Sequence, residues 1–158
     1  MATFQSTASM RVISATGEYA LRAAVFLAIH HPDARTTNQI VEGTRTPPGY
    51  LTKILHTMVR SELICSQRGM HGGFILAREP QLISVLDVLF SAKEGPQRIQ
   101  KCPMGLEDHT TLCSVHRLLD DVIAHAEKEF ARTTLKDLCS MSRGKQPLCE
   151  CGFKGPKH

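Results

Sequence analysis

The sequence predicts a mainly α-helical protein with one small β-hairpin and a long helix near its C-terminus. Three observations lead to this fold class. Apolar residues recur at helical spacing before residue 61, and two short strand-like runs joined by glycines follow them. Residues 112–132 then carry a single apolar stripe over the length of one long helix.

The first helix is predicted over residues 16–30, "TGEYALRAAVFLAIH". Thr16 or Ser14 caps it, Glu18 lies in the first turn, where the helix dipole favours an acid, and Pro32 ends it. Apolar residues recur along it with a period of about 3.6 residues. They are Leu21, Ala24, Val25, Ala28 and Ile29.

Two further helices follow in quick succession. Thr36 and Gln39 match a capping box in "TTNQIVEG", and Gly43 is predicted to end that helix. The next helix begins at Thr46 or Pro47, because proline is tolerated at the first helical position. Its buried stripe is Leu51, Ile54, Leu55 and Met58. This arrangement is typical of a helix-turn-helix unit, although other helical hairpins look similar.

The runs "LICSQRG" and "GGFILAR" are typical of two strands joined by a glycine-rich bend. Two strands directly after a helix-turn-helix form a wing. Only glycine lets the backbone approach DNA phosphates without a side-chain clash, and Arg68 and His71 add charge at the bend. A plain hairpin loop is the alternative, which the position after the helix pair disfavours. Cys65 is expected to be buried or half-buried.

The C-terminal half is predicted to contain a short helix, the long helix and a closing helix, "TTLKDLC". Ser84 and Asp87 cap the short helix, and Gly95 and Pro96 end it. The stripe of the long helix is Val115, Leu118, Leu119, Val122, Ala126 and Phe130. A single stripe of this length needs a partner surface. A second copy of the same helix supplies one in a two-fold dimer, which suits palindromic DNA.

Composition narrows the class of protein. A net charge of +4 permits a polyanionic partner such as double-stranded DNA. No apolar run approaches the ~18 residues that span a bilayer, and the start lacks a signal-peptide core, so a cytoplasmic protein without a membrane partner is expected. Six cysteines then favour metal binding or redox chemistry over disulfides. Beyond the cysteines no nucleophile–base pair is evident, so neither an enzyme nor a small-molecule substrate is predicted.

Cys102 and Cys113 border an irregular segment before the long helix, and His116 follows three residues later near the same helical face. Thiolates with an imidazole at close spacing suit iron–sulfur or zinc ligation. Two cysteines fall short of four ligands, so His109, His116 or an acid from elsewhere would complete the set. Two unrelated thiols are the alternative.

The chain therefore divides into five parts. They are residues 1–9, a disordered extension with translation starting at Met1 or Met10; 10–95, a winged helix-turn-helix domain; 96–111, a cluster-binding loop; 112–139, the dimerisation and closing helices; and 140–158, a flexible cysteine-containing tail. Cys139, Cys149 and Cys151 form a second metal site, a redox-active group, or exposed thiols without a role.

From Met10 to about Cys139 the chain resembles the Rrf2 family of bacterial winged-helix regulators, which includes IscR, NsrR, RirA and CymR. The matching stretches are "MRVISATGEYALRAAVFLA", "PPGYLTKIL", "QRGMHGGFILAR", "CSVHRLLDDV" and "TTLKDL". The resemblance implies a homodimeric DNA-binding protein. Many members sense iron–sulfur supply, nitric oxide or redox state through a 2Fe–2S or 4Fe–4S cluster near the dimer interface, whereas members such as CymR bind no cluster.

The resemblance also implies ligands. Cys102 and Cys113 correspond to the first and last of three cluster cysteines, and His116 to a histidine ligand. The middle cysteine is missing; the interval contains Glu107, Asp108 and His109 instead.

Glu18 corresponds to an acidic ligand that some members supply from the opposite subunit. Its alternative role is that of a partner for the helix dipole. The histidine that accompanies this acid in some relatives is Arg22 here, so that version of the site is not supported.

These features predict a homodimeric transcriptional regulator, acting as a repressor, gated by an iron–sulfur cluster with 2Fe–2S favoured over 4Fe–4S. The alternatives are a cluster-free member regulated by thiol oxidation or a partner protein and, from another class, a redox or electron-transfer protein. The Tyr50 ring is expected to pack inward with its hydroxyl near phosphate. Residues predicted to contact a palindromic operator are Thr36, Arg45, Thr46, Pro48, Gly49, Tyr50, Thr52, Lys53, Arg68, Gly69, His71, Gly72 and Gly73.

Overall fold

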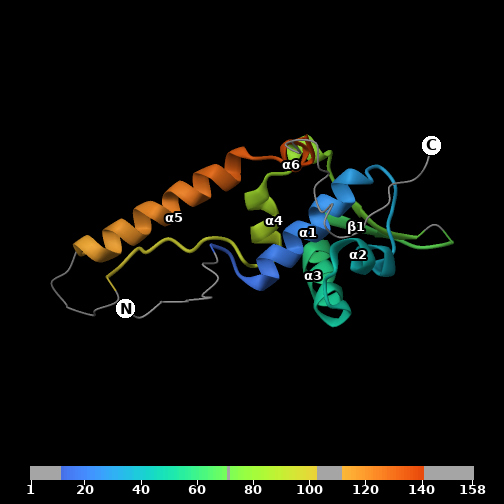
Figure 1. Cartoon of the computed structure of the whole chain (residues 1–158), viewed down its shortest axis with the longest axis horizontal. Helices are drawn as coiled ribbons and strands as arrows, with labels where there is room; N and C mark the ends of the chain where they lie inside the picture. Colours follow the sequence, from blue (N-terminus) through green and yellow to red (C-terminus); the bar gives the residue numbers. More distant parts are fainter. Residues whose placement is uncertain (1–11, 71, 103–111, 141–158) are drawn as a thin grey trace, which may run out of the picture.

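A computed structural model describes residues 12–70, 72–102 and 112–140, so the predicted extension 1–9, His71 and the tail from residue 141 onwards lie outside it. The elements are α1 Ala15–Ile29, α2 Thr37–Thr44, α3 Pro48–Arg60, β1 Ile64–Gln67, β2 Gly73–Leu76, the 3-10 turn η1 Pro80–Leu82, α4 Val85–Ser91, α5 Ser114–Arg132 and α6 Leu135–Ser140. α1 lies at the centre, in contact with α2, α3, α4, α6 and β2, while α5 extends to one side (Figure 1). The predicted fold class, mainly helical with one small sheet, is confirmed.

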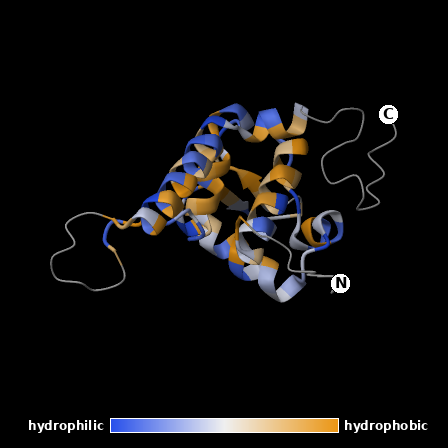
Figure 2. Cartoon of the chain, turned by 60° about the vertical axis from the view of Figure 1, so that its left-hand side comes forward, coloured by the Kyte–Doolittle hydropathy of each residue, from blue (hydrophilic) through white to orange (hydrophobic). Residues whose placement is uncertain are grey.

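α1 begins after Ser14, one of the two predicted caps, whose hydroxyl accepts a hydrogen bond from the Gly17 N–H at 2.9 Å. Its buried side chains are Ala20, Ala23, Ala24, Val25, Phe26 and Leu27. This face is broader than the predicted stripe, because elements pack on α1 from several sides. Ile29, at the end of the helix, is 36% exposed. Hydrophobic residues gather where the helices and the hairpin face one another (Figure 2).

The capping box of α2 is present: the Thr36 hydroxyl accepts from the Gln39 N–H, and the Gln39 side chain accepts from the Thr36 N–H. The prediction that Gly43 ends this helix was wrong. The chain turns instead at Arg45, whose φ of 51° is left-handed. Gly43 lies inside the helix, where an added Cβ would be 2.1 Å from the Phe26 ring. Glycine is required there by packing rather than by a turn.

α3 packs on the core through the predicted stripe, since Leu51, Ile54, Leu55 and Met58 are all buried. The hairpin that follows pairs Ile64 with Leu76 and Gln67 with Gly73 in antiparallel register. Ile64 takes the buried side of β1, so the next residue, Cys65, points outward and is exposed. The expectation that Cys65 is buried or half-buried was therefore wrong.

The predicted capping box of Ser84 and Asp87 starts α4. Gly95 and Pro96 do not end it, because the helix stops at Ser91 and the chain turns at Lys93, whose φ is 62°.

Backbone hydrogen bonds join the segment at the start of α4 to the segment between α5 and α6. The Val85 N–H donates to Thr133 O at 2.8 Å, and the Leu135 N–H donates to Ile83 O at 2.9 Å. These bonds hold the C-terminal end of α5 against the helical domain, with Leu135 buried beneath them. None of the helices in the described part of the chain is long and apolar enough to cross a membrane.

Gly43→Ala is expected to lower the free energy of unfolding by about 1–3 kcal/mol, because the new methyl group would overpack the site against the Phe26 ring. Gly49→Ala is the matched control, because nothing lies within 4 Å of its Cβ position. It should leave stability unchanged or raise it by up to ~1 kcal/mol. Urea unfolding followed by circular dichroism measures both. Equal stability of the two variants would contradict the packing of Phe26 on α2.

Candidate metal centre and nucleic-acid interface

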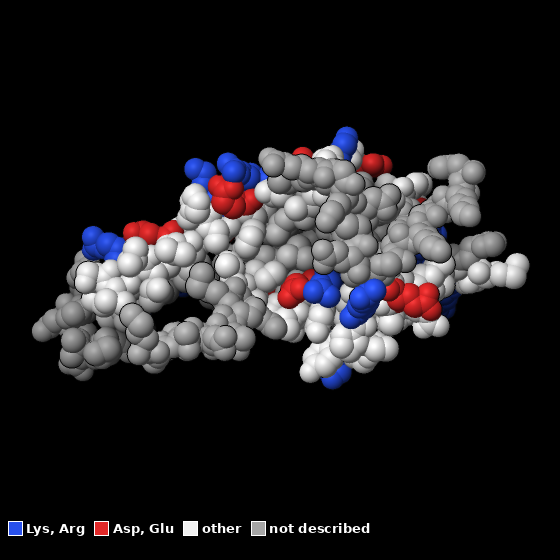
Figure 3. Space-filling model, in the orientation of Figure 1, with Lys and Arg blue, Asp and Glu red and all other residues white. Residues whose placement is uncertain are grey.

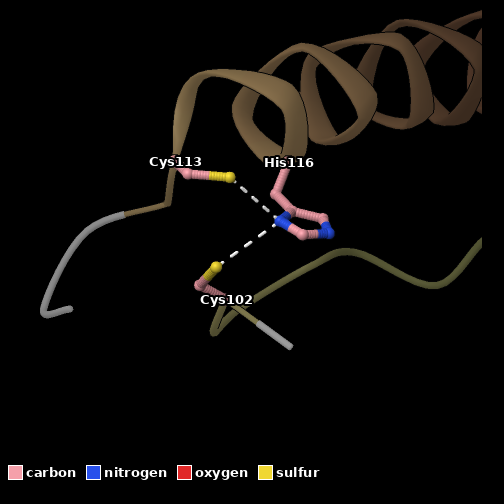
Figure 4. Close-up of side chains that lie close together, drawn as sticks. All are labelled: Cys102, Cys113 and His116. Atoms are coloured by element: carbon pink, nitrogen blue, oxygen red, sulfur yellow. Dashed lines mark hydrogen bonds between the residues drawn. The ribbon is translucent and has the colours of Figure 1, made fainter. Parts of the chain in front are cut away.

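Three of the predicted ligands come together at the start of α5. Cys113 occupies the N-cap position, His116 lies in the first turn, and Cys102 ends the described part of the segment that follows α4 (Figure 4). The His116 Nδ1 atom is 3.1 Å from the Cys113 sulfur and 3.4 Å from the Cys102 sulfur. All three donor atoms lie within 4.8 Å of one another. We refer to Cys102, Cys113 and His116 as the donor group.

The position of Cys113 at a helix N-terminus affects its chemistry. The backbone N–H of His116, and then its imidazole, lower the pKa of the Cys113 thiol from its ordinary value to about 7. A substantial fraction of Cys113 is therefore thiolate at neutral pH, which is the form that binds metals and attacks oxidants. Two sulfurs and one imidazole suit zinc or an iron–sulfur cluster rather than Mg²⁺ or Ca²⁺, which prefer oxygen ligands.

Among the described residues, the donor group is the only set of three His, Cys, Asp or Glu side chains close enough to share a metal ion. A fourth ligand is not part of it. The Glu18 carboxylate pairs with Arg22, one turn along α1. Ligation by Glu18 from an opposite subunit stays a prediction. Residues 107–109 lie outside the described part of the chain.

The other cysteines lie away from the donor group or outside the described residues. Cys139 packs half-buried against the hydrophobic core, and burial raises the pKa of its thiol. This is the opposite of the shift at Cys113. Cys149 and Cys151 are beyond the described residues, so a second metal site in the tail stays a prediction.

Asp120 is a residue of this region that sequence reasoning missed. Its carboxylate accepts hydrogen bonds from Arg98 Nε at 2.8 Å, from Arg98 Nη2 at 2.6 Å and from the Ile99 N–H at 2.8 Å. These bonds, those from Arg98 first, lower the pKa of Asp120 to about 2. The available signal was its spacing, because Asp120 follows His116 by four residues and so lies one helical turn along the same face.

The predicted base-reading end of α3 is an exposed surface. Pro48, Gly49, Thr52 and Lys53 are all exposed, and Arg45 is exposed on the preceding turn. Thr36, also a predicted contact, is exposed at the start of α2.

Two predictions for this surface were wrong. Thr46 is only 1% exposed and accepts a hydrogen bond from the Thr44 hydroxyl at 2.9 Å, so it stabilises the turn and is not available to DNA. Tyr50 does not pack inward. It is 60% exposed, and its ring centroid is 6.3 Å from that of Tyr19.

The backbone geometry of the wing itself requires Gly69, Gly72 and Gly73, whether or not DNA is bound. An added Cβ at Gly72 would lie 2.6 Å from Gln67 O, and at Gly73 it would lie 2.4 Å from Arg35 O. Gly69 has open space around it but a φ of +111°. A larger residue at Gly72 or Gly73 would therefore distort the wing before any DNA is bound, whereas Arg68 beside them is exposed.

Residues 13–141 match the model of the Rrf2 family, described as an iron-dependent transcriptional regulator. This chain belongs to the Rrf2 family. CymR of Bacillus subtilis is 32% identical to it over 136 residues, which span 85% of this chain and 94% of CymR. NsrR of Shouchella clausii is 26% identical over 126 residues, 77% of this chain and 83% of NsrR.

Two solved structures of the Rrf2 type share the fold. The structure of B. subtilis CymR, the global cysteine regulator of that organism, has a TM-score of 0.71 at 25% identity, covering 84% of this chain and 99% of CymR. The structure of T. potens IscR has a TM-score of 0.70 at 25% identity, covering 86% of this chain and 90% of IscR. This Rrf2 chain is accordingly a helix-turn-helix transcriptional regulator and not an enzyme.

In the reduced, metal-free protein, alkylation of Cys113 is expected to accelerate with rising pH around a midpoint of about 7, because only the thiolate reacts. His116→Ala should move the midpoint upward but not fully to the ordinary thiol value, since the backbone N–H at position 116 remains. Peptide mapping after timed iodoacetamide pulses measures the rate at Cys113 alone. His125→Ala, an exposed histidine farther along α5, is the control and should change nothing. An unchanged midpoint in His116→Ala would contradict the role of the imidazole.

Proposed function

We propose that this Rrf2 regulator is a homodimer that binds a palindromic operator as a repressor. In this proposal it senses iron–sulfur supply, nitric oxide or redox state through an iron–sulfur cluster ligated by the donor group. The observation that carries the proposal is the convergence of Cys102, Cys113 and His116 at the start of α5. The iron-dependent description of the family model and the similarity to IscR and NsrR support it.

The case for a dimer is the surface of α5. Val115, Leu118, Leu119 and Val122 are each between 48% and 65% exposed, and α5 has no buried residue. Acidic and basic side chains lie together along the outer edge of this helix, beside a largely uncharged surface (Figure 3). An apolar stripe of this length left in water favours self-association, and a two-fold axis would place the same stripe of a second copy against it.

The donor group supports an iron–sulfur cluster of the 2Fe–2S type, with 4Fe–4S as the second choice. Its two thiolates and imidazole are ligand types found in such clusters, and Glu18 of the partner subunit would be the fourth ligand. When bound, the cluster supplies a group that reacts with oxidants and nitric oxide. Cys102 comes from the segment after α4, and Cys113 and His116 come from the start of α5. Ligation by all three would therefore join that segment to the start of the helix.

That junction provides a route to DNA binding. α5 is fixed to the helical domain at its other end by the hydrogen bonds of Val85 and Leu135. Fixing the start of α5 as well would set its angle to the domain that carries α3. In a dimer built on α5, this angle determines the separation of the two α3 helices and so the half-site spacing that the dimer accepts.

A cluster-free regulator gated by thiol oxidation is the second candidate. The lowered pKa of Cys113 and the proximity of the Cys102 sulfur favour it, because a peroxide that oxidises one thiolate to a sulfenic acid lets the other thiolate attack that sulfur, displace hydroxide and form a disulfide. Protein purified without oxygen separates the two functions. Visible charge-transfer bands with bound iron and sulfide support the cluster, whereas colourless protein that forms a Cys102–Cys113 disulfide on oxidation supports the thiol switch.

Cys113→Ala and Cys102→Ala are expected to remove most of the iron and sulfide from anaerobically purified protein, because each deletes one thiolate ligand. Glu18→Ala should retain a cluster with an altered spectrum. Cys65→Ala is the matched control and should bind as the parent does, since Cys65 is exposed on the wing. If both donor-group variants carried as much iron and sulfide as the parent, ligation would have to come from Cys139, Cys149 and Cys151.

Lys53→Ala is expected to weaken binding to the promoter of its own gene and to reduce the salt dependence by about one unit of slope, as for a lost phosphate contact. Arg68→Ala should cost ~1–3 kcal/mol if Arg68 enters a groove. Fluorescence anisotropy at several salt concentrations measures both, with Lys136→Ala on α6 as a control for loss of one exposed lysine. An unchanged affinity and slope would remove Lys53 from the interface.

A further inference from the structure

The segment that carries Cys102 has little of its own to hold it in place. Residues 94–102 form no helix or strand, and within 97–101 Ile99 alone is half-buried while the other residues are exposed. Ordering such a segment costs roughly 1–2 kcal/mol per residue in backbone entropy, and burial of one half-buried side chain does not offset that. Some other interaction must position Cys102 beside α5.

The hydrogen bonds of Asp120 provide that interaction. The Asp120 side chain is only 13% exposed. Its carboxylate accepts hydrogen bonds from Nε and Nη2 of Arg98 and from the backbone N–H of Ile99. Charge-assisted, two-pronged pairs of this kind are shorter and more directional than ordinary hydrogen bonds. Arg98 also lies 3.8 Å from Glu127, two turns farther along the helix. The segment is therefore fixed to α5 three residues before Cys102.

The sequence of α5 places these contacts and the donor group on one face. Cys113, His116, Asp120, Ile123 and Glu127 follow one another at spacings of three, four, three and four residues. That spacing defines one side of a helix. All five are only partly exposed, whereas Val115, Leu118 and Val122 on the neighbouring stripe are exposed. The segment after α4 thus lies over one stripe and leaves the other uncovered.

We propose that Asp120 and Arg98 are positioning residues of the metal centre, which hold the 97–102 segment against α5 so that the Cys102 sulfur reaches Cys113 and His116. This inference rests on the proposed metal-binding function. Neither residue touches the metal; each acts through Cys102. Asp120→Asn should therefore remove Cys102 from the donor group while Cys113 and His116, on the helix itself, stay in place.

The first test uses the reduced full-length protein without metal. Dibromobimane bridges neighbouring thiols, and peptide mapping identifies the Cys102–Cys113 product. Asp120→Asn should slow this bridging roughly tenfold, as expected when one of two reacting groups is no longer held in place. Asp121→Asn is the matched control, with the same change of charge on the next residue, which is exposed. It should bridge at the parental rate.

The second test counts thiolate ligands with Co²⁺, whose sulfur-to-metal absorption grows with the number of bound thiolates. Asp120→Asn should weaken Co²⁺ binding by roughly 10–100-fold, the usual effect of losing a residue that orients a ligand. Its absorption should match that of Cys102→Ser. Arg98→Lys keeps the charge but loses the two-pronged geometry, and should give an intermediate result.

The outcomes separate the two proposals. Parental bridging and Co²⁺ absorption in Asp120→Asn would overturn the positioning role, and so would failure of the parent to bridge Cys102 to Cys113. If the parent bridges Cys102 to Cys113 and Asp120→Asn does not, the positioning role is supported. If the parent also carries no iron or sulfide, the cluster is refuted while the positioning role stands. If Asp120→Asn disturbs α5, as judged by circular dichroism, Arg98→Gln on the irregular segment decides by the same two measurements.

Discussion

The attachment of α5 at its C-terminal end is the constraint on which the rest of the functional architecture depends. Two backbone hydrogen bonds, from Val85 to Thr133 and from Leu135 to Ile83, fix this end against the domain that contains α3. α5 has 19 residues and is therefore roughly 28 Å long at 1.5 Å per residue. The donor group lies at the far end of that length. A small change of angle at the attachment therefore displaces the start of α5 by a large distance. Conversely, a large displacement at the start of α5 corresponds to a small change of angle at the attachment.

The donor group combines two chemistries that compete for the same atoms. A lowered pKa at Cys113 favours metal ligation and oxidation alike, because both require the thiolate. A shared metal and a disulfide both need the Cys102 sulfur near that of Cys113, so the position of Cys102 serves either outcome. His116 contributes to both outcomes through its backbone N–H and its ring. The same three residues therefore accommodate both kinds of Rrf2 sensor considered for this chain.

Local features of the fold could be predicted from the sequence, and features that depend on distant contacts could not. The capping boxes at Thr36 and Ser84 and the stripe of α3 follow from residues that are neighbours in sequence. The role of Gly43 was mispredicted because the Phe26 ring, which leaves no room for a side chain at Gly43, comes from another helix.

The candidate site shows the same division. Cys113 and His116 are one turn apart, so their proximity follows from helical spacing. The arrival of Cys102 depends on Arg98 and Asp120, which are 22 residues apart, and no local pattern reports that pairing. Thr46 shows the reverse problem, because its position in the turn suggested DNA contact whereas a buried hydrogen bond to Thr44 explains it.

The division of α5 into two parallel stripes has a consequence for how such regulators diversify. Residues that hold the Cys102 segment and the donor group recur on one stripe, and residues available for self-association recur on the next. Substitutions on the first stripe can change or abolish sensing without altering the second. If the chain binds a cofactor and pairs through α5 as proposed, a lineage can exchange one signal for another, or lose the cofactor, while the subunits continue to recognise one another.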